Sequence, residues 1–298
     1  MIFVADLHIR HSKPKTRVDN FLWAQDNKLN FICKEAQKSP PLIISGDLLH
    51  KPHSGPWAEQ YLIKLFDYYD LKPIIVPGQH DLLHHSLKLI EQSSIGVLEA
   101  AGVIIILTKE KRPIIINGKY VIWGCAFGEV PDKSMADPKK ENILIWHHMV
   151  IKRGSPLWEG QVSDNAETLL RLNNQYKIIC TGDNHQTHLT EKSGRFLINP
   201  GSTTRQSAIQ IDHRPCFFKF EDNKVEQVFL PVESDVFNIS HIKAAKEKET
   251  RYGDFINKLH AGYNIGVDLN SNFISFFEQN KIKKSVENLV WECIPDDK

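Results

Sequence analysis

The chain has 298 residues, of which 41% are hydrophobic and 24% are charged, as in an ordinary globular protein. These proportions exclude extensive disorder. The 37 lysines and arginines nearly balance the 36 aspartates and glutamates, so the formal charge of +1 excludes a strongly basic, nucleic-acid-coating protein. Any surface for nucleic acid must therefore be local.

Cysteine usage and hydropathy indicate the compartment. The five cysteines lack C-x-x-C spacing and several lie in apolar runs, so we expect reduced core cysteines. The chain begins on an apolar run without the pattern of a signal peptide, and no apolar stretch approaches membrane-spanning length. The sequence predicts a cytoplasmic protein that does not associate with membranes.

Short apolar runs alternate with amphipathic segments through the first two thirds of the chain, a pattern typical of α/β proteins. Residues 2–5, 42–45 and 73–76 are predicted as buried strands. Residues 18–38 and 56–69 are predicted as the helices between them. The expected opening is therefore β-α-β-α-β.

Antiparallel pairing is expected next along the chain. Residues 103–107, 114–116 and 119–125 have strand character, and Asn117-Gly118 between the last two is a strong signal for a two-residue hairpin. Buried strands are then expected at 143–146 and 177–181.

A helix is predicted at 164–174 because Asp164 is followed three residues later by Glu167, as in a capping box. Three more strands follow, at 195–199, 215–220 and 224–230. The mixed α/β domain is expected to span 1–232. Residues 233–298 are expected to form a helical region, with helices at 240–259 and 272–293, which either caps the sheet domain or docks a partner.

Polar residues with metal-ligating side chains follow five of the predicted strands. Each motif alone is weak, since a single histidine after a strand is usually a turn residue or a satisfied buried one. The ordered set favours a site, because α/β sheets place ligands beyond the carboxyl ends of their strands. The residues, strand by strand, are Asp6 and His8; Asp47; Gln79, His80 and Asp81; His147 and His148; and Asp183 and His185.

These side chains offer oxygen and imidazole ligands without thiolate, which indicates hard or borderline divalent ions. We expect two ions, Mn²⁺ in the first place and Mg²⁺ as the alternative. A carboxylate that bridges two ions roughly 3.5–4 Å apart is the arrangement used for phosphoryl chemistry.

The order D-x-H, G-D, G-Q-H-D, a lone His and G-D-x-H over residues 1–205 resembles the calcineurin-like metallophosphoesterase family. Within that family the chain is most similar to the SbcD-type DNA repair nucleases, particularly phage-encoded members. Residues 78–81 and the Asn-Pro-Gly-Ser run at 199–202 carry this likeness, with a weaker one in Val290-Trp291-Glu292. A phage origin would place the protein in the host cytoplasm.

The resemblance implies a four-layer α-β-β-α sandwich of two mixed sheets with a C-terminal helical appendage. It also implies a role for each candidate residue. His80 would act on the leaving oxygen or the transition-state phosphate with Asp81 orienting its imidazole, and Ser202 and Arg205 would contact substrate phosphate. One metal would be held by Asp6, His8 and His185, a second by Gln79, His147 and Asp183, with Asp47 bridging; His148 remains the alternative to His147.

Two residues depart from the family pattern. Gln79 replaces an Asn and Asp183 replaces the first His of G-H-x-H, so the second site is expected to be harder and to favour Mn²⁺ or Mg²⁺ over zinc, or else to be degraded. His50, where many members carry another Asp, is assigned a supporting or structural role. His84, His85 and His188 are expected at the surface or on the substrate side.

Three functions follow as hypotheses. The first is a metal-dependent DNA exo- or endonuclease, partnered by an SbcC-type ATPase and by a second copy of itself as a homodimer, acting in recombination and repair. The second is a phosphodiesterase or phosphatase on a small nucleotide, which the near-neutral charge favours. The third is a non-catalytic DNA-binding subunit, supported only by the two departures.

Overall fold

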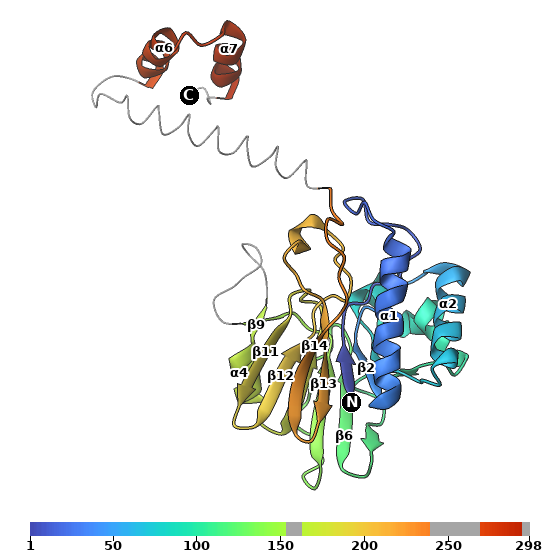
Figure 1. Ribbon diagram of the computed structural model, residues 1–298. Helices are drawn as coiled ribbons and strands as arrows, with labels where there is room; N and C mark the ends of the chain where they lie inside the picture. The colour runs from blue at the N-terminus through green and yellow to red at the C-terminus, as the bar shows by residue number, and fades with distance from the viewer. Residues whose placement is uncertain (153–162, 239–268, 294–298) are drawn as a thin grey trace. The chain divides into compact units, whose positions relative to one another are not determined.

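The computed structural model describes residues 1–152, 163–238 and 269–293. The chain separates into two compact units, Met1–Asn238 and Ile239–Lys298. The helix expected at 240–259 lies outside the described residues. Figure 1 shows the strands of the first unit with helices beside them.

The first of the two large sheets has six strands in the order β14-β13-β1-β2-β3-β4. Its strands β1 to β4 run parallel, whereas β13 pairs antiparallel with both β1 and β14. All six strands of this sheet overlap stretches that the sequence predicts as strands. The strands are β1 (Ile2–Val4), β2 (Leu42–Ser45), β3 (Ile74–Val76), β4 (Ile105–Ile106), β13 (Cys216–Glu221) and β14 (Lys224–Phe229).

The second sheet also has six strands, in the order β11-β12-β10-β7-β6-β5. Its four central strands are parallel, and the edge strands β5 and β11 are antiparallel to their neighbours. The hairpin predicted at Asn117-Gly118 is confirmed, since β5 and β6 pair on either side of it, but its loop has three residues, 117–119, because Ile116 pairs with Tyr120. The strands are β5 (Ile114–Ile116), β6 (Tyr120–Cys125), β7 (Glu141–Trp146), β10 (Tyr176–Thr181), β11 (His188–Lys192) and β12 (Arg195–Asn199).

Alternation along the strands builds the four layers, because successive side chains of a strand point to opposite faces. In β1, Ile2 and Val4 pack with residues of α1 (Phe21–Lys38) and α2 (Gly55–Tyr68), while Phe3 packs in the core between the two sheets. In the second sheet, Leu144 faces outward and packs with α4 (Ala166–Leu172), and its neighbours in β7 face the first sheet. The predicted α-β-β-α fold is confirmed.

The start of α4 corrects the prediction. Asp164 does not cap the helix, because it lies in β9 (Asp164–Asn165), which pairs with β8 (Val150–Ile151). Asn165 is the N-cap, and its side chain accepts from the backbone N–H groups of Glu167 and Thr168. A shorter helix, α3 (Ser94–Ala100), the three 3₁₀ turns between 79 and 92, and strand β11 were not predicted.

The second unit holds two described helices, α6 (Leu269–Gln279) and α7 (Lys284–Cys293), where one helix was expected at 272–293. Lys281 takes the left-handed backbone conformation, with φ of 50°, and the Ile282 N–H closes the end of α6 on the Phe277 carbonyl. The rings of Phe277 and Trp291 meet edge to face at 6.0 Å across the turn.

Among the described residues, Cys33, Cys125, Cys180 and Cys216 are free and buried, as expected. In this part of the chain, no helix has both the length and the hydropathy needed to cross a bilayer.

Candidate metal centre

The predicted ligands converge because parallel strands of the two sheets end close to one another. Asp6, Asp47 and Gln79 come two or three residues after β1, β2 and β3, and His147 directly follows β7. The loops after β1 and β2 are joined by backbone hydrogen bonds, including His8 N–H to the Asp47 carbonyl at 2.9 Å. All seven predicted metal ligands lie in one connected cluster of contacts.

The backbone at four ligands is in the left-handed region, which residues other than glycine seldom adopt. The φ angles are 48° at Asp6, 46° at His8, 53° at Asp47 and 74° at Asp183. At Asp6 and His8 the backbone therefore leaves the extended conformation of β1. Such strain costs on the order of 1–3 kcal/mol at each residue and concentrates at functional sites.

The first ligand set joins Asp6, His8 and His185, whose ligating atoms all lie within 4.8 Å of one another. The Nε2 atoms of His8 and His185 are 3.1 Å apart. One carboxylate oxygen of Asp6, Oδ1, accepts from the Asp183 N–H at 3.1 Å, while Oδ2 is buried without a hydrogen-bond partner in the described structure. A buried, unsatisfied carboxylate oxygen facing two imidazoles fits a cation.

The second set joins Gln79, His147 and Asp183. The side-chain amide of Gln79 lies 2.6 Å from His147 Nε2 and 2.6 Å from Asp183 Oδ1. His147 Nδ1 donates to the Ser45 carbonyl at 2.8 Å, which leaves Nε2 of the neutral ring as an acceptor. With Gln79 Oε1 facing His147 Nε2, two acceptors meet there; with the amide flipped, Oε1 faces Asp183 Oδ1 and two acceptors meet there instead. A cation bound between the two acceptors would remove their repulsion.

Asp47 lies between the two sets. Its Oδ1 accepts from the His80 N–H at 2.8 Å, and its Oδ2 is buried without a hydrogen-bond partner among the described residues. This Oδ2 lies 3.7 Å from Nε2 of His8 and 3.7 Å from Nε2 of His147. A carboxylate oxygen placed equally between one ligand of each set has the geometry of a bridge.

Three glycines leave the space that the ligands fill. A Cβ built on Gly46 or Gly182 would collide with the His147 ring, and one on Gly78 would collide with the Asp47 carboxylate. Gly46 also has φ of 86°, which favours glycine. The cradle around His147 and Asp47 therefore requires glycine at these three points.

Burial sets the electrostatics of the cluster. It raises the pKa of Asp6 to about 7 and raises the pKa of Asp47 well above its usual value, where Asp81 and Asp6 add to the effect. It also lowers the pKa of His8 well below its usual value. The buried carboxylates thus lack compensating positive charge, and the oxygen and imidazole donors fit two hard or borderline divalent ions.

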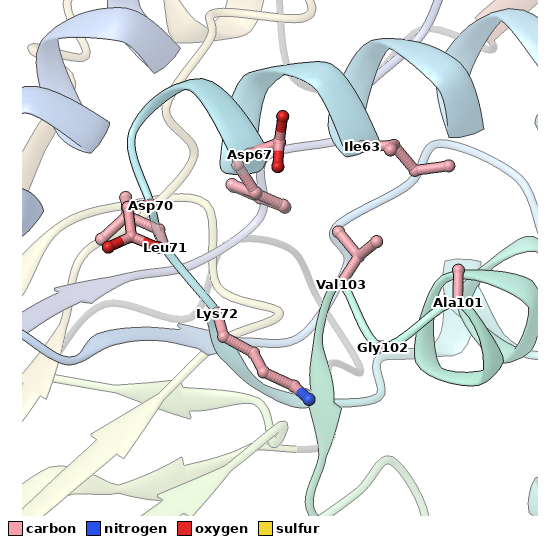
Figure 2. Close-up of a pocket in the computed structure, with 9 residues that line it drawn as sticks. Ile63, Asp67, Asp70, Leu71, Lys72, Ala101, Gly102 and Val103 are labelled. Carbon is pink, nitrogen blue, oxygen red and sulfur yellow. The ribbon is translucent and has the colours of Figure 1, made fainter.

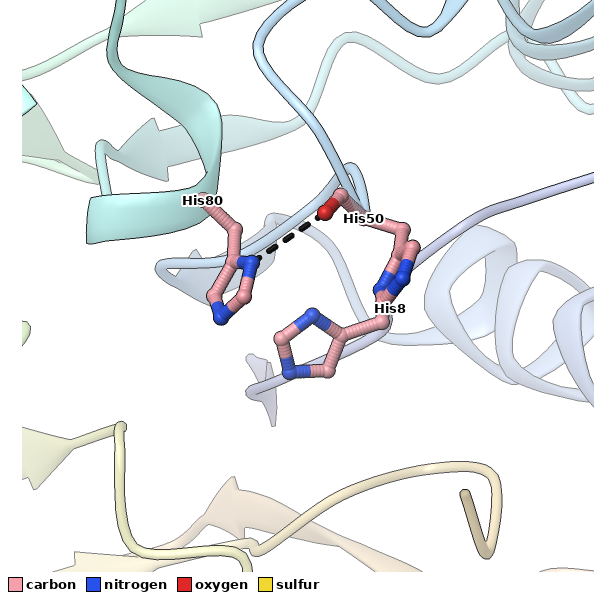
Figure 3. Close-up of side chains that lie close together, drawn as sticks. All are labelled: His8, His50 and His80. Atoms are coloured by element: carbon pink, nitrogen blue, oxygen red, sulfur yellow. Dashed lines mark hydrogen bonds between the residues drawn. The ribbon is translucent and has the colours of Figure 1, made fainter. Parts of the chain in front are cut away.

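His50 and His80 stand beside this centre (Figure 3). His80 Nδ1 donates to the His50 carbonyl at 3.1 Å, the two rings stack with centroids 5.8 Å apart, and the His80 ring meets His8 edge to face at 4.8 Å. Ligating atoms of His8, His50 and His80 also lie within 4.8 Å of one another. Sequence reasoning gave His50 only a supporting role, although its spacing three residues after Asp47 was a signal.

The structure corrects the role of Asp81. Its carboxylate does not orient the His80 imidazole but accepts the backbone N–H groups of Leu48, Leu49 and Gly78, at 3.3, 2.9 and 3.0 Å. Asp81 is fully buried, and burial raises its pKa while these hydrogen bonds oppose the rise. It holds the Asp47 loop against the Gln79 loop, and the His50 carbonyl orients His80 instead.

Three other histidines are placed by their contacts. His147 joins the cluster, whereas His148 stacks on Trp146 and contacts Asp164 at 2.6 Å, so His147 is the one of the two that is placed to act as a ligand. His188, expected at the surface or the substrate side, is buried, and its Nε2 contacts the Val150 carbonyl at 3.1 Å.

The two expected phosphate contacts are engaged within the protein. Ser202 is fully buried, and its Oγ accepts from Gln210 Nε2 at 2.8 Å, so this structure does not present it to a substrate. The Arg205 guanidinium donates to the carbonyls of Ile211 and Glu233 and lies over the Phe237 ring. The role of Arg205 at the substrate stays a prediction.

A pocket of about 420 Å³ lies apart from the metal ligands, between α2 and the segment that follows α3 (Figure 2). Apolar side chains, including Ile63, Leu71 and Val103, line it together with Asp67 and Lys72. None of the seven ligands lines it.

No protein-family model matches the sequence, and no curated protein matches it either. Solved structures with a similar fold include a putative 5′-nucleotidase from Staphylococcus aureus, at 15% identity over 83% of this chain and 57% of that one, with a TM-score of 0.48. A phosphopantetheinyl hydrolase from Mycobacterium tuberculosis matches at 11% identity over 76% and 94%, with a TM-score of 0.46. An archaeal phosphodiesterase matches at 11% over 77% and 98%, with a TM-score of 0.40. These likenesses concern the fold and decide no activity.

Proposed function

We propose that this protein is a divalent-metal-dependent phosphodiesterase that binds two ions and hydrolyses DNA. The observation that carries the two-ion site is the placement of Asp47 Oδ2, buried, unpartnered among the described residues and 3.7 Å from a histidine of each ligand set. Asp6, His8 and His185 would hold one ion, and Gln79, His147 and Asp183 the other. When bound, such a pair polarises phosphoryl oxygens and lowers the pKa of water.

His80 is the residue we assign to the leaving oxygen. The His50 carbonyl holds its Nδ1–H, so its Nε2 is directed away from that contact, and no described residue bonds to it. Burial lowers the pKa of His80, and the His50 hydrogen bond opposes that effect. A histidine so placed, protonated at Nε2 as well as at Nδ1, would give the Nε2 proton to the departing 3′ oxygen and return to the neutral ring, while Asp47 accepts the backbone N–H of His80 and fixes its loop.

DNA is the proposed substrate because the motif order resembles SbcD-type nucleases. The proposed partners are an SbcC-type ATPase and a second copy of this chain. Helices α6 and α7 support a docking role for the second unit, since Ile274, Val286 and Leu289 are exposed apolar side chains on them. The proposed metal is Mn²⁺, because Asp183 supplies an anionic oxygen where an imidazole is usual.

A small nucleotide diester is the second candidate substrate, and the observation that favours it is the net charge of only +1. Both candidates use the same ions and the same His80. They differ in how much of the substrate the protein must contact outside the metal centre.

The test is hydrolysis of linear duplex DNA, single-stranded DNA and bis-(p-nitrophenyl) phosphate by the purified protein with Mn²⁺, Mg²⁺ or EDTA. We expect Mn²⁺-dependent degradation of DNA that His80→Ala abolishes. Turnover of the small diester with both DNAs untouched, also after addition of an SbcC-type ATPase, would favour the small nucleotide. No hydrolysis of any substrate would contradict the proposal.

A further inference from the structure

An exposed group of stacked rings lies on the chain segments that follow the ligands His8 and Asp47. The Trp57 indole stacks on the Tyr61 ring with centroids 5.4 Å apart and planes 1° from parallel, and the His11 ring meets Trp57 at 4.9 Å and 72°. Trp57 is 38% exposed, and His11 is exposed as well. The Trp57–His11 pair therefore offers open ring surface to the solvent.

This ring surface is held in a fixed geometry. The Tyr61 ring, on which Trp57 stacks, is itself held, because its hydroxyl donates to Asp26 Oδ1 on α1 at 2.7 Å. Trp57 belongs to the first turn of α2, so its backbone is also fixed. A ring that is already ordered loses little conformational entropy when a flat ligand stacks on it.

The surface is close to the ligands along the chain. His11 comes three residues after His8, so their Cα atoms are at most about 11 Å apart. The loop that leads from Asp47 to Trp57 is hydrogen-bonded to the loop that carries His11, through His50 N–H to the Ile9 carbonyl at 3.1 Å. A substrate held at the metal centre can thus extend over these rings.

The charge around the rings fits a phosphate backbone. Residues 8–18 contain Arg10, Lys13 and Lys15 besides the buried Arg17, which pairs with Asp19, and residues 48–58 contain Lys51. Lys13, Lys15 and Lys51 are exposed. The two loops thus carry exposed positive charge although the overall charge is only +1, and such charge attracts nucleic acid.

We propose that Trp57 and His11 form a stacking site for a nucleobase of the strand whose phosphodiester is hydrolysed at the metal centre. The inference rests on the proposed function, because a nucleobase is expected here only if the substrate is a nucleic acid. Aromatic side chains stack on bases of any sequence, and each such contact contributes on the order of tenfold or more in affinity. The site would position a single strand without reading its sequence.

The test compares a short single-stranded oligothymidylate with an abasic oligonucleotide of the same length. Binding is measured by fluorescence anisotropy in EDTA, so that hydrolysis does not enter. The wild-type protein is expected to bind the oligothymidylate about tenfold more tightly than the abasic strand. Trp57→Ala should bring the two affinities together and leave that for the abasic strand unchanged, which also shows that the variant is folded.

Two further variants sharpen the test. Trp57→Phe keeps a flat ring and should retain part of the preference for bases. Trp23→Ala, which removes a 52% exposed tryptophan on α1 outside the ring group, should retain all of it. Equal binding of the two strands by the wild type, or an undiminished preference in Trp57→Ala, would overturn the inference.

The test of the stacking site and the test of the proposed function can fail independently of each other. DNA hydrolysis that depends on His80, with no base preference, would leave the nuclease standing and remove the stacking site. Base preference that depends on Trp57, with no hydrolysis of any DNA, would keep the stacking site and contradict the nuclease.

Discussion

The side-chain amide of Gln79 lies 2.6 Å from Asp183 Oδ1, although 104 residues separate the two along the chain. These are the two residues at which the chain differs from the motifs that it resembles, and they contact each other. The longer arm of Gln79 reaches both Asp183 and His147, at 2.6 Å each. The two departures therefore belong to one altered ligand set.

Shortening the side chain of Gln79 should weaken the binding of the second ion. Gln79→Asn removes one methylene, so the amide can no longer reach His147 and Asp183 together. We expect at least a tenfold loss of affinity for the second Mn²⁺, measured by isothermal titration, with the first ion retained. Unchanged binding of both ions would show that Gln79 is not a ligand.

Changing both residues together should alter metal preference. Gln79→Asn with Asp183→His exchanges an anionic oxygen for an imidazole, a softer ligand that suits zinc. We expect the double variant to bind Zn²⁺ in preference to Mn²⁺ in a competition titration. A ratio of affinities equal to that of the wild type would contradict this account.

His80 should be required for turnover but not for metal binding. His80→Ala removes the imidazole that the His50 carbonyl holds, and leaves the backbone N–H that Asp47 accepts. The metal content should stay at the wild-type value while the rate of hydrolysis falls on the order of a hundredfold or more. His84→Asn, a change at an exposed histidine with φ of 51°, is the matched control and should keep full activity.

Gly78 should tolerate no side chain. A Cβ at this residue would collide with the Asp47 carboxylate, so Gly78→Ala should displace the bridging ligand, lower the metal content and reduce thermal stability. Gly102→Ala is the comparison, because its Cβ meets nothing within 4 Å and only its φ of 73° is unfavourable. Equal metal content in Gly78→Ala and the wild type would show that the cradle is looser than the structure indicates.

Lys28 should make stability depend on pH. It is 4% exposed on α1, and burial, with Arg17 and Arg205 nearby, lowers its pKa to about 8. Between about pH 8 and 10.5 the unfolded chain keeps a proton that the folded protein releases, so this residue makes the folded state more stable as pH rises through that range. Below about pH 8 the buried charge is a cost.

Lys28→Met should therefore raise the free energy of unfolding at pH 7, by about 1–3 kcal/mol, and remove this part of the pH dependence. Urea denaturation at pH 7 and pH 9.5 measures both effects. Lys34→Met, an exposed change on the same helix, should alter neither. A loss of stability at pH 7 in Lys28→Met would show that the ammonium is well compensated where it lies.

Periodicity in the sequence predicted the strands, the helices and the edge at which the candidate ligands gather, because apolar strands and amphipathic helices follow directly from residue spacing. The four layers were implied only by the resemblance to a known family. Periodicity could not predict the left-handed backbone at Asp6 and His8, where the N–H groups bond to the loop after β2. Nor could it predict that Asp81 would hold backbone N–H groups, because a carboxylate next to a histidine suggests a direct pair. His50 was undervalued because its approach to His8 and His80 arises only on folding.

Asp47 is the residue on which the two-ion site depends. The most direct measurement is the metal content of the wild type and of Asp47→Asn after equilibration with Mn²⁺, by mass spectrometry, together with hydrolysis of DNA by both proteins. The account predicts two ions and turnover in the wild type, and at most one ion without turnover in Asp47→Asn. It also predicts that Asp47→Asn is the more stable of the two in EDTA, since the variant buries no uncompensated carboxylate. Equal metal content and equal activity in the two proteins would contradict the account.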